Sequence, residues 1–173
     1  LSILFGFVVD VDYNWNADGG YYPDPETSED REILSVIAKM VDDNNDDIYT
    51  FVSHGDENGF CLDFACTMGR ITARELASRL KNGEFNYKNQ KTIVLYACNT
   101  GKGDNSAAQQ LADAMGNGIM VIAPNAYVNV QHNFLPLFKI YPKFDITLSS
   151  DDDSSSNGGA KWRVFSKSYS VEF

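Results

Sequence analysis

The feature that most constrains the fold is a buried strand that ends at a cysteine. Residues Thr92 to Ala97 are apolar or β-branched, which is typical of a strand inside a core. Cys98 follows, then a turn marked by Gly101 and Gly103, and then a helical pattern from about Asn105 to Met115. Open α/β sheets bind their ligands at the carboxyl ends of such strands. The sequence therefore predicts that Cys98 lies at a functional edge of an α/β sheet.

Predicted strands and helices alternate on both sides of this unit. Strands are predicted at residues 1–11, 48–53 and 119–123, and helices at residues 28–41 and 72–80 with Thr72 as a cap. Such alternation predicts one mainly parallel sheet with helices on both faces, in which residues 1–11 form a central strand. Residues 12–29 are rich in Gly and Pro, so we expect a connection without regular structure, and residues 59–65 are predicted to form a short strand or hairpin.

After Pro124 the pattern changes to short strands that carry aromatic residues. They are predicted at residues 127–130, 144–148, 161–165 and 169–173, with a mobile loop at residues 149–159. A chain of 173 residues with 43% hydrophobic content can bury one sizeable core. We therefore expect a single domain, with an α/β core over residues 1–124 and a β-rich extension over residues 125–173.

The chain shows no run of apolar residues long enough to span a membrane, and no signal-peptide pattern. We therefore expect a soluble protein. Because the first residue is Leu1 rather than Met, the sequence is consistent with a piece of a longer protein.

The net charge of −10 is unevenly distributed along the chain. Residues 1–63 carry a net charge of −13, whereas residues 64–173 carry +3. An acidic first half disfavours nucleic acids and anionic membranes as partners, and would attract basic peptides or cations. The acidic run at residues 42–47 could hold Ca²⁺, but it lacks the Gly and the distal Glu of an EF-hand loop. A solvated loop is favoured there, and no metal or other cofactor is predicted.

Three cysteines are too few for a disulfide framework in a chain of this size. Cys61 and Cys66 could bridge a hairpin, but free cysteines commonly behave as small buried hydrophobic residues. Reduced thiols are therefore the favoured interpretation of Cys61 and Cys66.

Two predicted strands end in reactive residues, at His54 and at Cys98. If the strands are neighbours, both side chains emerge at the carboxyl edge of the sheet. A thiol with an ordinary pKa of about 8.5 is mostly protonated at neutral pH, so a nearby imidazole would raise its reactivity. Gly55 lacks a Cβ, so its amide could approach a substrate carbonyl and form an oxyanion hole with the amide of Cys98. This combination predicts acyl transfer, most often amide hydrolysis.

Other polar residues are weaker candidates for this site. Asp10, Asp12 and Asp56 could orient an imidazole or line a basic subsite, although each is more typical of a solvated strand end. His132 lies in a polar stretch with no predicted strand end to position it, so a loop histidine is expected there.

Phe51-Val52-Ser53-His54-Gly55 and Val94-Leu95-Tyr96-Ala97-Cys98 resemble the two signature blocks of the caspase-like (clan CD) cysteine peptidases. The segments Cys98 to Gly101, Asn105 to Ala112 and Val121 to Pro124 are most similar to the members associated with bacterial toxins. The resemblance covers about residues 1–130. It implies a caspase-like three-layer sandwich, a cysteine endopeptidase, and a protein or peptide substrate, including its own flanking sequence.

The resemblance also implies roles for individual residues. Cys98 would be the nucleophile, His54 the proton donor, and the amides of Gly55 and Cys98 the oxyanion hole. The resemblance places the S1 substrate pocket at three parts of the chain. They are the segment Asp10 to Tyr13, with Asp10, Asp12 and Tyr13 as the candidate residues, then Tyr96, and then the segment Asn125 to Tyr127. Tyr96 departs from the acidic or amide residue of several relatives, which leaves the P1 preference open, while Asp10 and Asp12 allow a basic P1. Toxin protease domains that bind inositol hexakisphosphate need a basic cluster, and the scattered basic residues here predict no such ligand.

The leading hypothesis is therefore a thiol protease that acts as an autoprocessing or effector domain of a larger, secreted bacterial protein. One alternative keeps the pair His54 and Cys98 for deamidation or transpeptidation. Another is a non-catalytic caspase-like module that binds a basic partner through its acidic first half. The sequence makes no prediction of the oligomeric state.

Overall fold

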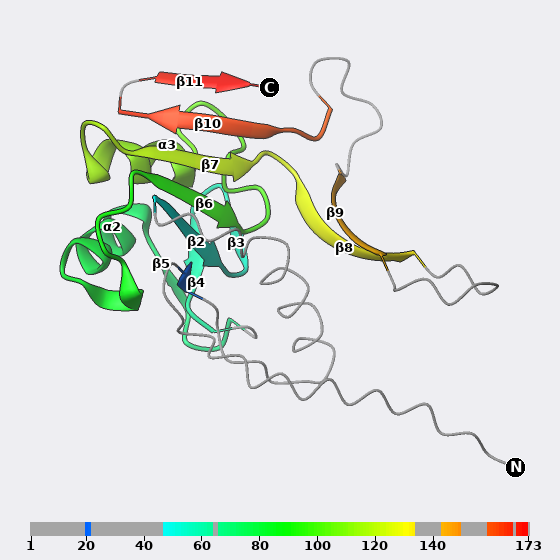
Figure 1. Ribbon diagram of the computed structural model, residues 1–173, viewed down its shortest axis with the longest axis horizontal. Coiled ribbons are helices and arrows are strands. Elements are labelled where there is room, and N and C mark those ends of the chain that lie inside the picture. Colours follow the sequence, from blue (N-terminus) through cyan, green and yellow to red (C-terminus); the bar gives the residue numbers. More distant parts are fainter. Residues whose placement is uncertain are drawn as a thin grey trace, which may run out of the picture.

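A six-stranded sheet forms the centre of the described structure (Figure 1). The computed structural model describes residues 20–21, 47–63, 66–133, 143–149, 159–167 and 169–172. The sheet has the strand order β1 (Gly20–Tyr21), β2 (Ile48–Val52), β6 (Thr92–Tyr96), β7 (Met120–Pro124), β10 (Trp162–Ser166) and β11 (Tyr169–Glu172). The pairs from β1 to β7 are parallel, and the pairs from β7 to β11 are antiparallel. The predicted mixed α/β fold with a mainly parallel sheet is confirmed.

Two smaller antiparallel sheets flank the central one. The first contains β3 (Gly55–Asp56), β4 (Gly59–Cys61) and β5 (Arg70–Ile71). The second is a hairpin of β8 (Tyr127–Asn133) and β9 (Lys143–Ser149), which extends away from the end of β7 (Figure 1). The four strands predicted after Pro124 are thus present. Two of them form the hairpin, and the other two, β10 and β11, continue the central sheet.

The described α helices begin within two residues of their predicted starts. The α2 helix (Ala73–Lys81) is capped by the Thr72 side chain, which accepts a hydrogen bond from the Glu75 amide. The α3 helix (Ala107–Met115) is capped in the same way by Ser106. A single 3₁₀ turn, η1 (Glu84–Asn86), follows α2. Both α helices place apolar residues three and four positions apart, so each presents one stripe to the core.

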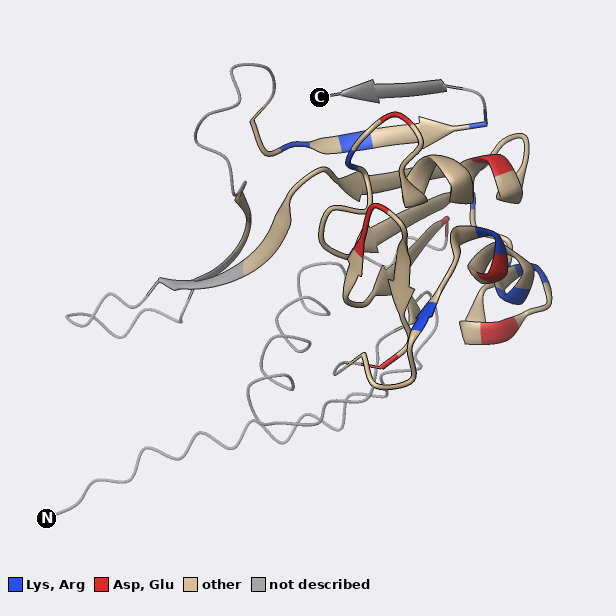
Figure 2. Cartoon of the chain, turned by 180° about the vertical axis from the view of Figure 1, so that it is seen from behind, with Lys and Arg blue, Asp and Glu red and all other residues tan. Residues whose placement is uncertain are grey.

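One face of the central sheet packs against these helices. Along β6 the buried residues alternate with half-buried ones. The residues of β2, β7 and β10 that are aligned with the buried positions of β6 lie on the same face of the sheet. The strands of the central sheet are uncharged apart from one basic residue in β10 and Glu172 in β11; Figure 2 shows the basic position in blue. The core residues of this face are Tyr49, Phe51, Ile93, Leu95, Val121, Ala123 and Phe165, and they belong to one hydrophobic cluster with Leu76, Leu80, Leu111 and Met115 of the helices.

The expectation that residues 12–29 lack regular structure is wrong at one point. Gly20 and Tyr21 form β1, paired with β2. The Tyr21 ring stacks on Phe51 with a centroid distance of 4.9 Å and lies 4.7 Å from the ring of Phe85. Aromatic packing therefore holds Gly20 and Tyr21 at the edge of the sheet, although the composition of residues 12–29 predicts only a loop. The predicted strand 1–11, the helix 28–41, the acidic residues 42–46 and most of the loop 149–159 lie outside the described residues, so helices on both faces remain a prediction.

Candidate active site

His54 and Cys98 follow two strands that are direct neighbours in the sheet. β2 and β6 are parallel, and their last paired residues are Val52 and Tyr96. The ladder continues one step further, because the Ser53 amide donates a hydrogen bond to the Tyr96 carbonyl over 3.2 Å. His54 and Cys98 each lie two residues beyond the Val52–Tyr96 pair, and neighbouring strands are about 4.8 Å apart. The predicted neighbourhood of the two strand ends is therefore present.

Gly55 packs directly against the segment that carries Cys98. A Cβ added at Gly55 would lie 2.8 Å from Thr100 Cγ2 and 3.1 Å from Ala97 Cβ. Both partners are buried, so only glycine fits without a shift. The sequence suggested that glycine here admits a substrate carbonyl. The structure gives an additional reason, which is close contact between the end of β2 and the end of β6.

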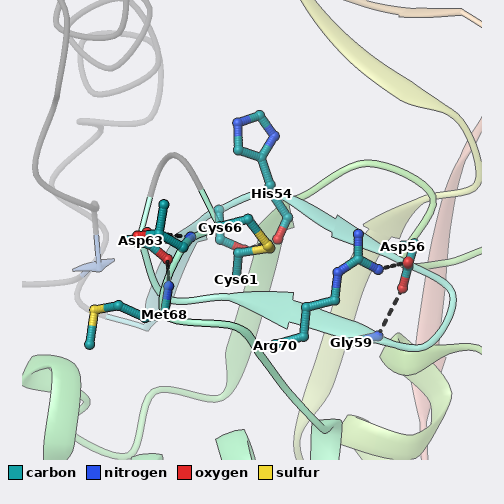
Figure 3. Close-up of a disulfide and its surroundings, with 10 residues drawn as sticks. His54, Asp56, Gly59, Cys61, Asp63, Cys66, Met68 and Arg70 are labelled. Carbon is teal, nitrogen blue, oxygen red and sulfur yellow. Dashed lines mark hydrogen bonds and ion pairs between the residues drawn. A yellow bond between two sulfur atoms is a disulfide. The ribbon is translucent and has the colours of Figure 1, made fainter.

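His54 is exposed, and its backbone is fixed from two sides. Its carbonyl accepts a hydrogen bond from the Cys61 amide over 2.8 Å and another from the Ser53 hydroxyl over 2.9 Å. The imidazole points away from the β3–β4–β5 sheet in Figure 3. The ring thus stands at the surface on a backbone that the neighbouring strand holds in place.

Cys98 is half-buried and is the free cysteine of the described chain. Its sulfur accepts a hydrogen bond from the Val128 amide, with an N···S distance of 3.4 Å. This contact places the sulfur against the start of β8. The next residue, Asn99, has φ 57° and donates its amide to the Ala126 carbonyl over 2.9 Å. The segment after β7 therefore lies against the candidate nucleophile.

The expectation of reduced thiols at positions 61 and 66 is wrong. Cys61 and Cys66 form a disulfide with a Cα–Cα distance of 5.1 Å, within the normal range (Figure 3). Cys61 ends β4, and the chain turns back to reach β5, where Arg70 pairs with Cys61 in the ladder. This turn brings two cysteines that are five residues apart to bonding distance. The disulfide is attached directly to the candidate site, because the Cys61 amide holds the His54 carbonyl.

The loop closed by the disulfide is further held by Asp63. Its carboxylate accepts hydrogen bonds from the amides of Thr67 and Met68 and from the Thr67 hydroxyl. The Thr67 side chain is the main reason that the pKa of Asp63 lies below its ordinary value. Asp63 therefore adds hydrogen bonds to Thr67 and Met68 beside the covalent bond between Cys61 and Cys66.

Asp56 serves the small sheet rather than an imidazole. Its carboxylate accepts hydrogen bonds from the amides of Asn58 and Gly59 and forms an ion pair with Arg70, as Figure 3 shows in part. These contacts close the turn between β3 and β4.

His132 also differs from its predicted setting, because it lies within β8, opposite Phe144, rather than in a loop.

The predicted substrate pocket is only partly within the described residues. Asp10, Asp12 and Tyr13 lie outside them. Tyr96 is half-buried, and its ring meets the ring of Trp162 edge to face at 5.4 Å. The remaining two pocket residues follow β7. Asn125 accepts a hydrogen bond from the Lys161 amide, and Tyr127 is 38% exposed at the start of β8.

Sequence reasoning missed Trp162 and Arg163 as neighbours of the site. The run from Trp162 to Ser166 alternates like any half-buried strand, and nothing in it points to the end of β6. The Trp162 ring meets Tyr96 because β10 pairs with β7, with Trp162 opposite Pro124.

Within the described residues, no three His, Cys, Asp or Glu side chains are grouped as a metal site would require. No helix of the described part is long and apolar enough to cross a membrane.

Comparison with known proteins identifies the family of this chain but not its activity. Residues 23–137 match the family described as "Domain of unknown function (DUF8616)", and the chain belongs to that family. The chain is also 31% identical over 101 residues to the uncharacterized protein YibJ of Escherichia coli (strain K12). That alignment covers 58% of this chain and 38% of YibJ, so the chain spans well under half of that relative. No solved structure matches the chain. The family match spans both His54 and Cys98.

Proposed function

We propose that the protein is a cysteine peptidase in which Cys98 is the nucleophile and His54 the proton donor. The observation that supports the proposal best is the register of β2 and β6, which sets the two residues equally far beyond a paired position. The tight contact of Gly55 with Ala97 and Thr100 supports it further, since it joins the two strand ends. The mixed, mainly parallel sheet is compatible with a caspase-like three-layer sandwich, which is part of the proposal.

The chemistry of this proposal needs a reactive sulfur and a mobile proton. The Cys98 thiol gives its proton to His54 and its sulfur attacks the carbonyl carbon of the scissile bond, so that a C–S bond forms and the carbonyl electron pair moves to oxygen. When the intermediate collapses, the C–N bond breaks and His54 gives a proton to the leaving nitrogen. Water, deprotonated by His54, then attacks the thioester carbon; the C–S bond breaks, the acid product leaves, and His54 returns the proton to the Cys98 sulfur. The balance of atoms requires water and the peptide only.

The oxyanion of the intermediate would be bound by backbone amides. Under the proposal these are the amides of Gly55 and Cys98, which belong to the two strand ends that touch. Each such donor contributes about 3 to 4 kcal/mol to acyl-transfer catalysis. The packing of Gly55 against Ala97 and Thr100 would keep the two amides at a fixed separation.

The disulfide bears on where such an enzyme would work. Disulfides persist in oxidising compartments, and Cys98 has no cysteine partner within the described residues. A thiol peptidase with this pattern is compatible with delivery as an autoprocessing or effector domain of a secreted bacterial protein. The acidic first half of the chain would favour a basic protein or peptide as substrate.

The proposal is tested with the full chain and a mixture of unstructured proteins as substrate. Cys98→Ala should abolish chain cleavage while the circular dichroism spectrum stays unchanged, and His54→Ala should lower the rate by 100-fold or more. His132→Ala is the matched control, because His132 is the second histidine of the chain and lies in a different sheet. Undiminished cleavage in Cys98→Ala would refute the proposal.

The same assay separates the alternatives. A mass increase of one dalton in glutamine-containing proteins, without chain cleavage, would assign deamidation to the pair. New isopeptide or peptide bonds would assign transpeptidation. If the wild type leaves all substrates intact and the double variant His54→Ala/Cys98→Ala retains a basic partner, the domain is a binding module.

A further inference from the structure

A buried arginine holds the turn that follows Cys98. Arg163 lies in β10 opposite Ala123, on the same face as Phe165, and only 8% of its surface is exposed. Arginine is seldom buried so deeply unless its guanidinium finds partners. The partners of this guanidinium therefore indicate what the residue does.

Two carbonyl groups of the glycine-rich turn are partners of this guanidinium. Arg163 Nη1 donates hydrogen bonds to the Gly101 carbonyl over 2.7 Å and to the Gly103 carbonyl over 2.9 Å. The guanidinium also lies 5.0 Å from the centroid of the Phe165 ring, within range for a cation–π contact. One nitrogen thus binds two carbonyls, three and five residues after Cys98.

The same turn is attached to the segment that ends β7. The Gly101 amide donates to the Pro124 carbonyl over 2.8 Å, and the Asn99 amide donates to the Ala126 carbonyl over 2.9 Å. A Cβ at Gly101 would lie 2.9 Å from the Ala123 carbonyl oxygen and 3.2 Å from the Phe165 ring, so the turn is seated closely on β7 and β10. The turn is therefore held in two ways. Its carbonyls at Gly101 and Gly103 bind Arg163, and its amides at Asn99 and Gly101 bind the segment that ends β7.

We propose that Arg163 is a positioning residue for Cys98, acting through the turn from Asn99 to Gly103. The effect of Arg163 on catalysis rests on the proposed peptidase function. Its effect on the position of the turn does not. Without the guanidinium the carbonyls of Gly101 and Gly103 lose their donor, and the turn can leave β7. The Cys98 amide and sulfur, which immediately precede the turn, then lose their fixed orientation. A misplacement of about 1 Å in such a site can lower the rate on the order of 100-fold.

Three variants test the inference. Arg163→Met keeps a long side chain and removes both hydrogen bonds, whereas Arg163→Lys keeps a cationic donor that can bind two carbonyls. Val164→Ala is the matched control, because Val164 is the neighbouring residue of β10 and lies on the opposite face of the sheet from Arg163. If Arg163→Met does not fold, Arg163→Gln, whose amide is too short to reach both carbonyls, takes its place.

The first measurement is amide hydrogen exchange together with the iodoacetamide labelling rate of Cys98. In Arg163→Met the exchange of the Asn99 and Gly101 amides should rise at least tenfold more than the exchange of β6 amides, and the labelling rate should change. Arg163→Lys should restore most of the protection, and Val164→Ala should affect β6 and the turn equally. Unchanged exchange of Asn99 and Gly101 in Arg163→Met, or no recovery with lysine, overturns the positioning role.

The second measurement is peptide cleavage, which tests the link to catalysis. In Arg163→Met kcat should fall on the order of 100-fold with KM within about twofold, since substrate contacts remain. Altered exchange and labelling with unaltered kcat would overturn the catalytic consequence. If the wild type cleaves no peptide, the proposed function fails, while exchange and labelling still decide whether Arg163 holds the turn.

Discussion

The α-carbon of Gly55 lies so close to Ala97 that a methyl group at position 55 would stand 3.1 Å from the Ala97 side chain. The same methyl would stand 2.8 Å from Thr100 Cγ2, which is fully buried. Gly55→Ala should therefore destabilise the protein by about 1 to 3 kcal/mol, the usual range for overpacking a core. Urea unfolding measures this free energy.

The control for this prediction removes the methyl that clashes. Thr100→Ser deletes Cγ2 but keeps the hydroxyl that donates to the Ala97 carbonyl. The double variant Gly55→Ala/Thr100→Ser should recover part of the lost stability. Additive losses from the two substitutions would mean that Gly55 and Thr100 do not compete for the same space.

The labelling of cysteines should separate Cys98 from the other two. In the native protein without reductant, iodoacetamide should add one label, at Cys98, because Cys61 and Cys66 are bonded to each other. In denaturant the count should remain one before reduction and become three after it. Mass spectrometry of the intact chain gives the count, and three labels before reduction would contradict the disulfide.

Removal of the disulfide should lower stability and loosen His54. The bond closes a short loop, for which the loop-entropy relation gives about 2 kcal/mol. Cys61→Ser/Cys66→Ser should lose roughly that amount and show faster exchange of the Cys61 amide, which donates to the His54 carbonyl. Thr67→Val, which removes the hydroxyl bound to Asp63 but not the disulfide, is the control. Equal effects of the two changes on Cys61 exchange would argue against a specific role of the bond.

The two helix caps provide a matched pair of variants. Thr72→Ala and Ser106→Ala should each cost about 1 kcal/mol, because each leaves an amide of the first helical turn without its acceptor. Ser106 follows the turn after Cys98, whereas Thr72 precedes α2. Only Ser106→Ala should therefore alter the labelling rate of Cys98. A comparable change in Thr72→Ala would show that labelling reports global stability instead.

Trp162 should influence substrate choice if the proposed peptidase is correct. Its ring contacts Tyr96, the residue two positions before Cys98. Trp162→Leu should change the ratio of kcat/KM between peptides that differ at P1 by about tenfold, since one edge of the aromatic pair is lost. Met120→Leu, at an exposed residue at the opposite end of β7, serves as the comparison. An unchanged ratio in Trp162→Leu would exclude this ring from the pocket.

The sequence predicts the central part of this fold well, because local signals agree there with tertiary packing. The strands at residues 48–53, 92–97 and 119–123 are rich in apolar and β-branched residues, and Thr72 stands where a helix needs a cap. The neighbourhood of His54 and Cys98 follows from two strand ends in one parallel sheet. Residues 1–11 and 28–41 cannot be compared, since they lie outside the described structure.

The missed features depend on contacts that no local pattern encodes. Gly20 and Tyr21 are too short a strand to show periodicity, and their place is set by the rings of Phe51 and Phe85. The Cys61–Cys66 bond depends on how β4 turns toward β5. Arg163 alternates like an ordinary strand residue, and its partner at Gly101 is 62 positions away in the sequence.

The 62 positions between Gly101 and Arg163 determine the order in which this part of the protein is assembled. A ribosome releases the strand that carries Cys98 well before it releases β10, so the nascent chain has its thiol before it has the guanidinium that fastens the adjoining turn. During this interval the turn would be held by β7 alone. If Cys98 is the nucleophile, as we propose, its turn would be held by Arg163 only after β10 has been made, and the peptidase would be inactive before that point.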